Sequence, residues 1–377
     1  MSAAEAPRGA APRLLVLTPD FAPARGGIQA LLLGLLPGMG AFQTRVLALG
    51  SAGAEAFDRQ SALDIRRVGA GARLGAQGAN AALNALALAE ALRFAPDAIM
   101  GAHIVTSPAS AVIRRTRGVP VLQYFHANEI GHKPRLAVFA ARHADASIAV
   151  SSYTAGLLGG VGAPLGGVRL ISPGVDLPRD PSPLPGERPT VLTVARLKER
   201  YKGHDVMIRA LAAVRARVPD VRWIVIGEGP LRAELEQLAR SHGVQAQTRF
   251  LGAVSDEERD RWLRRADVFA MPSRLPGGRL AGEGFGIVYL EASAYGKPVV
   301  AGNVGGAIDA VRDGETGILV DPNDASAVAE AISRLLLDPD LSARLGRGGA
   351  EHARALAWPS VAARVEGVLL ELLGRAR

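Results

Sequence analysis

The sequence has 377 residues and no cysteine. Disulfide bonds, thiolate nucleophiles and cysteine-ligated zinc sites are therefore excluded, and we expect a reducing, cytoplasmic compartment. Aromatic residues are also scarce, at 5% of the chain, and no basic run interleaves with them. Because single-stranded nucleic acid is usually held by such interleaved residues, we expect no nucleic-acid partner.

Long hydrophobic runs are absent as well. No window holds 18 uninterrupted apolar residues; the best candidate, Ile28 to Phe42, is broken by Gln29 and Pro37, so we expect no membrane-spanning helix. The first residues, Met1 to Arg13, carry a glutamate and two prolines and have no apolar segment. We therefore expect a loose tail there and not a secretion signal.

The composition supplies enough apolar material for two cores. Hydrophobic residues make up 48% of the chain, charged residues 21%, and the mean hydropathy is +0.15, as in soluble globular proteins. At about 150 residues per domain, this length predicts two domains. The excess positive charge lies in residues 1–175, with 16 Lys and Arg against 9 Asp and Glu, whereas residues 176–377 hold 28 against 27. A basic first half can attract a phosphorylated substrate or an anionic membrane, although an arginine-rich surface alone would also explain it.

Short apolar runs alternate with segments of helical period along the whole chain. Such alternation predicts parallel strands joined by crossover helices, with ligands at the carboxyl ends of the strands. A segment with five prolines, Leu177 to Pro189, separates two such arrays. We therefore predict an α/β protein of two doubly wound, Rossmann-like domains that face each other across a cleft, residues 1–178 and 188–357. The predicted strands cover residues 14–18, 44–49, 98–100, 119–125 and 146–150, then 190–194, 222–226, 248–251, 268–271, 298–301 and 317–320; the predicted helices cover residues 28–36, 81–94 and 108–115, then 205–218, 231–241, a segment after 286, and 325–337.

Two facing domains suit an enzyme that joins two substrates, one held by each domain. The glycine-rich fingerprint of nicotinamide-dependent enzymes is missing, because Gly227 and Gly229 lack the third glycine and Gly26-Gly27 lacks the register. We expect no cofactor. No His-x-x-x-His or Asp-x-Asp follows a predicted strand, and Asp338 and Asp340 fit a turn between helices, so we expect no metal site.

One segment of the second half places two carboxylates at a probable ligand site. Glu283 precedes a glycine-containing loop that opens a predicted helix, and Glu291 lies inside that helix on an otherwise apolar stretch. A helix start with free N–H groups and a carboxylate on either side suits an anionic ligand rich in hydroxyl groups.

This Glu-x7-Glu spacing around Phe-Gly-Ile-Val resembles the donor-site motif of the retaining GT-B glycosyltransferases of family four. The resemblance extends over residues 14–360, and four stretches look closest to the actinobacterial phosphatidylinositol mannoside mannosyltransferases: residues 25–29, 126–129, 276–282 and 284–292. The other family segments occur in the family's order: Gly26-Gly27-Ile28, Tyr124-Phe125-His126, Ser172 to Asp176, Arg196, Lys202 to Asp205, Gly227 to Leu231, and Val304-Gly305-Gly306.

The resemblance implies a role for each matching residue. Arg196 and Lys202 would clamp the donor diphosphate and take the place of a metal ion. Glu283 would bind hydroxyls of the transferred sugar, and Glu291 would accept from the ribose hydroxyls. His126 would face the sugar from the first domain and support it by hydrogen bonds instead of acting as the base. The remaining donor contacts would be the backbone at Gly26, Gly27, Phe285, Gly286 and Ile287, and the main chain of Val254 at the base; His103, and His132 with Lys133, are further candidates on the acceptor side.

The implied function is a metal-independent, retaining transfer of a hexose from a nucleotide-sugar to a hydroxyl of a lipid-linked or polyol acceptor. GDP-mannose is the favoured donor, and UDP- or ADP-glucose is the alternative. A sugar-nucleotide epimerase of the same fold would convert the donor without an acceptor. A non-catalytic nucleotide-sugar sensor would bind the donor without turnover.

Two further expectations concern the surface. The final helix, residues 358–377, is amphipathic without a basic face, and in this fold it would pack back on the first domain. The basic first domain, on the acceptor side, could touch the inner face of an anionic membrane. The candidate membrane-facing charges are Arg114, Arg115, Arg117, Lys133 and Arg135.

Overall fold

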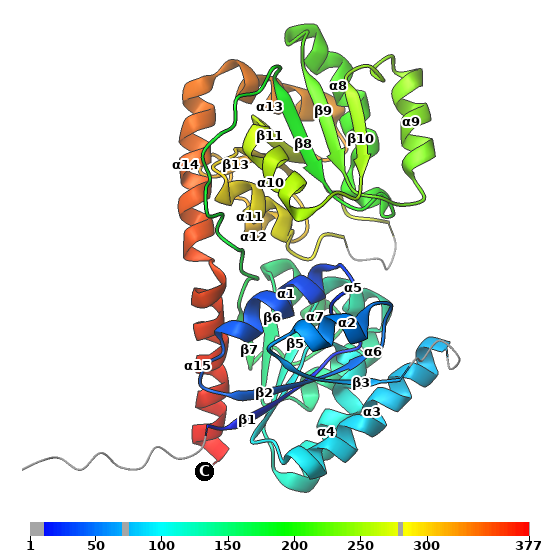
Figure 1. The fold of residues 1–377 in the computed structure, drawn as a ribbon, viewed down its shortest axis with the longest axis vertical. Helices are drawn as coiled ribbons and strands as arrows, with labels where there is room; N and C mark the ends of the chain where they lie inside the picture. The colour runs from blue at the N-terminus through cyan, green and yellow to red at the C-terminus, as the bar shows by residue number, and fades with distance from the viewer. Residues whose placement is uncertain (1–10, 70–74, 278–281, 377) are drawn as a thin grey trace, which may run out of the picture.

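The computed structural model describes residues 11–69, 75–277 and 282–376. Two α/β domains lie one above the other, each built on its own sheet (Figure 1). Two predicted segments lie partly outside the described residues: residues 1–10 of the N-terminal tail, and residues 278–281 of the stretch 276–282.

The first sheet has seven parallel strands in the order β3-β2-β1-β4-β5-β6-β7. Its central strands β1, β4 and β5 are short, mainly apolar runs that are buried except for the first residue of β1, Arg13, which is half-buried. β3 and β7 were not predicted, because at the two edges of the sheet charged residues alternate with half-buried ones. The strands are β1 (Arg13–Leu17), β2 (Gln43–Leu49), β3 (Asp64–Val68), β4 (Ala98–Gly101), β5 (Val121–Phe125), β6 (Ala146–Ala149) and β7 (Val168–Leu170).

The second sheet has six parallel strands in the order β10-β9-β8-β11-β12-β13. All six match the predicted runs to within about one residue at each end. The strands are β8 (Thr190–Val194), β9 (Arg222–Ile226), β10 (Thr248–Gly252), β11 (Val268–Met271), β12 (Val299–Gly302) and β13 (Gly317–Val320). The prediction of an α/β fold with two doubly wound sheets is confirmed.

Helices cover the faces of both sheets (Figure 1). In the first domain these are α1 (Gly27–Leu35), α2 (Ala54–Gln60), α3 (Gly75–Phe94), α4 (Ser107–Arg117), α5 (Ala127–His132), α6 (Pro134–Arg142) and α7 (Ser152–Gly160), with the short turns η1 (Leu36–Gly38) and η3 (Ile104–Thr106). In the second part of the chain they are η4 (Arg200–Lys202), α8 (His204–Arg217), α9 (Arg232–Ser241), α10 (Asp256–Arg265), α11 (Ile287–Ala294), α12 (Ala307–Ala310), α13 (Ala325–Leu337), α14 (Pro339–Ala355) and α15 (Trp358–Ala376). Asp338 caps α14 by accepting from the Leu341 N–H at 2.9 Å, which is the turn role that its sequence predicts.

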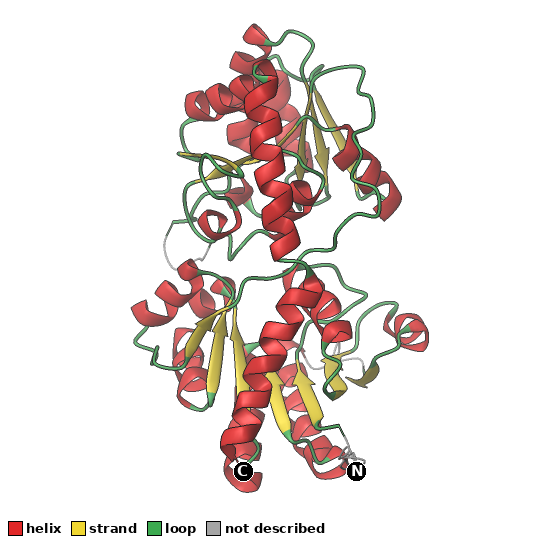
Figure 2. Cartoon of the chain, turned by 90° about the vertical axis from the view of Figure 1, so that its left-hand side faces the viewer, coloured by secondary structure: helices red, strands yellow, loops and turns green. Residues whose placement is uncertain are grey.

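The last two helices connect the domains. α14 and α15 follow one another along one side of both domains (Figure 2). Trp358, Val361 and Leu369 of α15 are buried in the same hydrophobic cluster as Leu14 of β1. At the junction of the helices, Val175 pairs with Ala357 and its N–H donates to the Leu356 carbonyl at 3.0 Å. The chain therefore crosses between the domains twice at one place.

Among the described helices, none combines the length and the apolar character that a bilayer crossing requires.

Candidate functional site

Lys202 and Glu283 form an ion pair at the carboxyl edge of the second sheet. The Lys202 Nζ lies 2.5 Å from the Glu283 Oε2, and both side chains are nearly buried. Burial lowers the pKa of Lys202, but Glu283, Tyr201 and Glu199 together outweigh burial, so the pKa lies above its ordinary value. The structure thus brings together a cation and a carboxylate that the sequence places 81 residues apart.

Backbone packing explains why these loops meet. Gly203, directly after Lys202, has φ 80°, and a Cβ there would lie 2.2 Å from the Pro272 carbonyl oxygen. The Arg274 N–H also donates to the Tyr201 carbonyl at 2.7 Å. Only glycine permits this approach, so the loop after β8 lies directly against the segment after β11.

Arg196 belongs to the same group of charges, although it is more exposed. Its guanidinium lies 2.9 Å from Glu199, and 58% of its side chain is accessible. The pKa of the nearby Tyr201 hydroxyl is raised, chiefly by burial, and it is also shifted by the charges of Lys202, Glu283, Glu199 and Arg196. These four charges therefore surround one tyrosine at the end of β8.

Glu291 lies on α11 and faces different partners. Its Oε1 is 3.3 Å from the Arg259 guanidinium of α10. Burial raises the pKa of Glu291, Arg259 lowers it, and Asp176 raises it again. Glu291 is thus a half-buried carboxylate beside the place where the chain crosses between the domains. Its two oxygens can accept hydrogen bonds from the two hydroxyls of a diol.

The start of α11 is held in one conformation by its glycine. Gly286 has φ 91°, and a Cβ there would lie 2.4 Å from the Tyr289 ring. The Tyr289 hydroxyl is buried and donates to the Met271 carbonyl at 2.8 Å. Phe285 is buried in the adjoining cluster, so only its main chain can meet a ligand, and Ile287 and Val254 are half-buried against the same cluster.

Gly26 and Gly27 open α1 after β1. Gly26 has φ 175°, an extended conformation that any residue adopts, and the space where a Gly27 Cβ would lie is open. None of their described contacts reaches Lys202 or Glu283, so this pair stays a prediction.

On the first domain, His126 ends β5 and precedes α5. Its Nε2 lies 3.1 Å from the Ala102 carbonyl oxygen, and its own N–H donates to the Glu129 Oε1 at 3.0 Å. Burial lowers the pKa of His126 to about 4, so the ring is neutral at neutral pH. A neutral ring whose Nε2 donates to a carbonyl is suited to hydrogen bonding and not to general-acid work.

Two contacts join the domains at this edge. A Cβ on Gly284 would lie 3.6 Å from the Ala127 Cβ, so the donor-side loop touches the residue after His126. Asp309 of α12 accepts from the Ser152 N–H at 3.2 Å and from the Ser152 hydroxyl at 2.8 Å. The carboxyl edges of the two sheets therefore face each other, and the residues that follow His126 and Glu283 are in contact.

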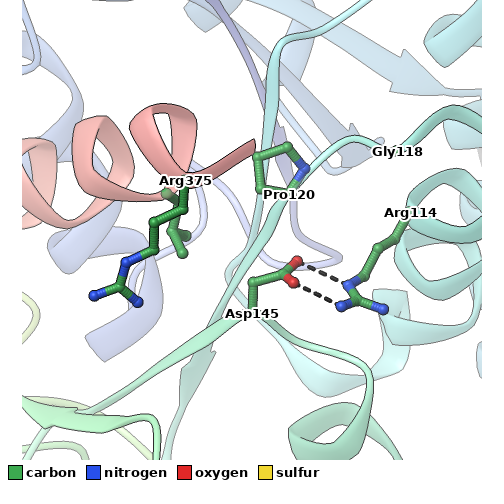
Figure 3. A pocket seen from close by; sticks show the side chains of 6 residues that line it. Arg114, Gly118, Pro120, Asp145 and Arg375 are labelled. Carbon is green, nitrogen blue, oxygen red and sulfur yellow. Dashed lines mark hydrogen bonds and ion pairs between the residues drawn. The ribbon is translucent and has the colours of Figure 1, made fainter. Parts of the chain in front are cut away.

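A separate hollow of about 390 Å³ lies at the opposite, amino edge of the first sheet (Figure 3). There Arg114 donates through Nε and Nη2 to Asp145, which also accepts from the Val121 N–H. Arg114 is thus held by a structural carboxylate. Of the five basic residues predicted to face a membrane, the other four, Arg115, Arg117, Lys133 and Arg135, are exposed.

The sequence did not single out several residues of the site. Arg259 and Tyr289 carry no signal of their own, because their partners are distant in sequence. Glu129 could have been found, since a carboxylate three residues after a helix N-cap is a recognised capping arrangement. Within the described residues, no group of three or more His, Asp or Glu side chains is placed to hold a metal ion.

Two protein families together match most of the chain, residues 25–352. A family described as "Glycosyltransferase Family 4" matches residues 25–179, and one described as "Glycosyl transferases group 1" matches residues 176–352. A protein of Mycobacterium tuberculosis named GDP-mannose-dependent alpha-(1-6)-phosphatidylinositol monomannoside mannosyltransferase is 34% identical over 95% of this chain and 98% of its own length. The protein of the same name from Mycolicibacterium smegmatis is 34% identical over 90% and 93%.

Solved structures share the fold at lower identity. The Anabaena protein HepE in complex with UDP and glucose superposes with a TM-score of 0.77 at 22% identity, covering 96% of this chain and all of HepE. The sucrose-phosphate synthase of Thermosynechococcus elongatus superposes equally well, also at 22% identity, over 96% of this chain and all of its own. These matches agree with the two-sheet architecture found here.

Proposed function

Because this chain belongs to the family-four glycosyltransferases of the GT-B fold, we propose that it transfers mannose from GDP-mannose to a hydroxyl of a lipid-linked acceptor that resembles phosphatidylinositol mannoside. The observation that carries the proposal is the 34% identity, over nearly the full length of both chains, to proteins named for that reaction. The transfer would proceed with retention of configuration. The chain is a hexosyltransferase.

The donor would lie along the carboxyl edge of the second sheet. We assign the diphosphate to Lys202 and Arg196, because a lysine with a raised pKa and an always-charged guanidinium neutralise the leaving group. With two cations there, the chemistry needs no metal ion. Glu283 would bind hydroxyls of the sugar, Glu291 those of the ribose.

The first domain would approach the sugar through His126. Its ring is neutral and Nε2 faces a carbonyl, so its part would be positional, with the donor phosphate assisting deprotonation of the acceptor. The backbone at Gly26, Gly27, Phe285, Gly286 and Ile287 would approach phosphate and sugar, and the Val254 main chain would meet the base.

A transfer assay tests the proposal. Purified protein is incubated with phosphatidylinositol monomannoside and, in parallel, radiolabelled GDP-mannose, UDP-glucose or ADP-glucose, and labelled lipid is resolved and its linkage read by mass spectrometry. We expect labelled lipid from GDP-mannose alone. Label from a glucose nucleotide, conversion of the donor without acceptor, or binding without turnover would each contradict it.

We also propose contact with an anionic membrane through Arg115 and Arg117 of α4, Lys133 directly before α6, and Arg135 in its first turn. All four are exposed, and α4 packs against α6. Sedimentation with phosphatidylinositol-containing vesicles should fall sharply between low salt and about 0.5 M salt, since exposed charges are screened there. Charge reversal of Arg115 and Arg117 should weaken binding by about 30-fold or more, at about 1 kcal/mol for each charge lost. Vesicle binding that salt leaves unchanged would rule out this contact.

A further inference from the structure

Two buried side chains beside His126 are unused by the assignments above. Glu129 of α5 is 7% exposed and contacts two loops of the first domain. Its Oε1 accepts from the His126 N–H, and its Oε2 accepts from the Ile104 N–H at 3.1 Å. The same Oε2 lies 3.1 Å from the Nδ1 of His103. One carboxyl group thus joins the loops that follow the adjacent strands β4 and β5.

The contacts of His103 decide where the proton lies. Its Nδ1 accepts from the Val105 N–H at 3.2 Å, so it carries a lone pair. A lone pair on Nδ1 facing an ionised Oε2 at 3.1 Å would be repulsive. A proton on Nδ1 would instead oppose the Val105 N–H. A proton on the Glu129 Oε2 avoids both conflicts: that hydroxyl donates to the Nδ1 lone pair, which it shares with the more distant Val105 N–H, and its oxygen still accepts from Ile104.

We propose that Glu129 is a positioning residue of the transfer reaction, a neutral carboxylic acid that fixes His103 as the tautomer with its proton on Nε2. Among the described residues, none is recorded as a partner of that Nε2–H. A neutral donor would therefore be available beside His126, at the edge where the acceptor hydroxyl must arrive. The inference rests on the proposed function for its role in transfer, but not for the placement of the proton.

Burial supports the same protonation states. It raises the pKa of Glu129 to about 8 and lowers that of His103 to about 3. The charged or titratable groups that face Glu129 are Asp20 after β1, which raises its pKa, and Lys133 at the end of α5, which lowers it, together with the neutral His103 and His126. Above about pH 8, loss of the proton would move the hydrogen to Nδ1 and break the Val105 contact.

Nitrogen NMR of the histidine rings tests the placement directly. The His103 signal is assigned by its loss in His103→Asn. In the wild-type protein we expect a neutral ring with its proton on Nε2 from pH 6 to 7.5. Near pH 8 the ring proton should move to Nδ1. In Glu129→Gln the amide NH2 donates to Nδ1 and cannot ionise, although it cannot accept from the Ile104 N–H, so the ring proton should stay on Nε2 through pH 8. A proton on Nδ1 at pH 7, or the same step in Glu129→Gln, would overturn the inference.

Transfer kinetics test the role. The turnover number of the wild-type enzyme should fall above about pH 8, whereas Glu129→Gln should retain at least about a third of it at pH 7 and show no fall there. Glu129→Ala should lose about tenfold or more in kcat with little change in the donor KM. Glu55→Gln, on exposed α2, is the matched control and should keep the wild-type profile.

The experiments distinguish a failure of the proposed function from a failure of the role assigned to Glu129. If the NMR result is as expected but no mannose is transferred, the proposed function is wrong and the proton placement stands. If mannose is transferred and kcat of Glu129→Gln falls above pH 8 as in the wild type, Glu129 is not the group that the reaction depends on.

Discussion

At the scale of single residues, Lys202 and Glu283 neutralise each other in the free protein. Their ion pair is nearly buried, so each charge depends on the other. In the proposed donor site, a diphosphate would take Lys202 from Glu283 and leave the carboxylate free for the sugar hydroxyls. Diphosphate binding and sugar recognition would then be coupled through one contact.

This coupling predicts opposite effects of Glu283→Gln on binding and catalysis. Without the carboxylate, Lys202 is free for the diphosphate, so the Kd of GDP should fall about threefold to tenfold, as measured by calorimetry. Transfer should fall about 100-fold or more, because the sugar loses its anionic acceptor. Glu234→Gln, which alters an exposed ion pair with Arg200, should change neither. Weaker GDP binding by Glu283→Gln would contradict the coupling.

Glu291 should affect donor affinity more than chemistry. An amide cannot accept from two ribose hydroxyls as a carboxylate does, so Glu291→Gln should raise the donor KM about tenfold and lower kcat less than about threefold. Initial-rate kinetics measure both constants. Glu351→Gln on the exposed side of α14 is the control. A fall in kcat with the donor KM unchanged would remove the ribose assignment.

The residue types of the donor site were predictable from sequence, but their partners were not. Glu283 and Glu291 stand in a recognisable spacing, and Arg196 and Lys202 follow a predicted strand. The ion pairs that set the charge of these residues join distant parts of the chain. Arg259 is 32 residues from Glu291, and Lys202 is 81 residues from Glu283, so both pairs form only when the ends of different strands come together in the fold.

At the scale of elements, the proposed donor site depends on how α11 begins. Gly286 has a left-handed backbone directly over the Tyr289 ring, and Tyr289 is fixed by two hydrogen bonds. The N–H groups of the first turn are thereby directed to one point near Glu283.

Gly286→Ala should therefore destabilise the protein and impair donor binding together. The left-handed backbone costs about 1–2 kcal/mol for alanine, and the contact with the ring adds to it, so thermal unfolding should shift down by several degrees. The Kd of GDP should rise in the same variant. Gly314→Ala is a matched control, because Gly314 has φ 71° with open space around its Cβ. Equal effects of both variants would show that ring packing is unimportant.

The sequence predicted buried strands well and edge or short elements poorly. All six strands of the second sheet are apolar runs and were found, whereas β3, with Asp64, Arg66 and Arg67, does not look like a strand until it pairs with β2. α5 has six residues, too few for a helical period to be visible.

At the scale of the whole molecule, the two domains are joined by the chain crossover and by contacts between the carboxyl edges of their sheets. The chain crosses between them at Val175 and Ala357, and Asp309 bonds Ser152 from the other domain. No composition or pattern argument could have located the Asp309 contact, because it depends on the relative placement of two complete domains.

Asp309→Ala should therefore loosen the arrangement of the domains. Loss of the carboxylate removes two hydrogen bonds from Ser152, one from its hydroxyl and one from its N–H that both carboxylate oxygens share, and each is worth about 1 kcal/mol. We expect small-angle scattering to give a larger radius of gyration for the free protein and GDP-mannose to restore it. Asp220→Ala, at an exposed turn, should scatter as the wild type does. An unchanged radius would mean that the helices α14 and α15 alone set the arrangement.

In the proposed site, one donor molecule contacts four charged side chains. The most direct measurement is a crystal structure of the protein with GDP-mannose. We predict the diphosphate between Lys202 and Arg196, mannose hydroxyls on Glu283, ribose hydroxyls on Glu291, and the Lys202–Glu283 contact replaced by contacts to the donor. A diphosphate bound elsewhere, or Lys202 and Glu283 still paired beside a bound donor, would contradict the account.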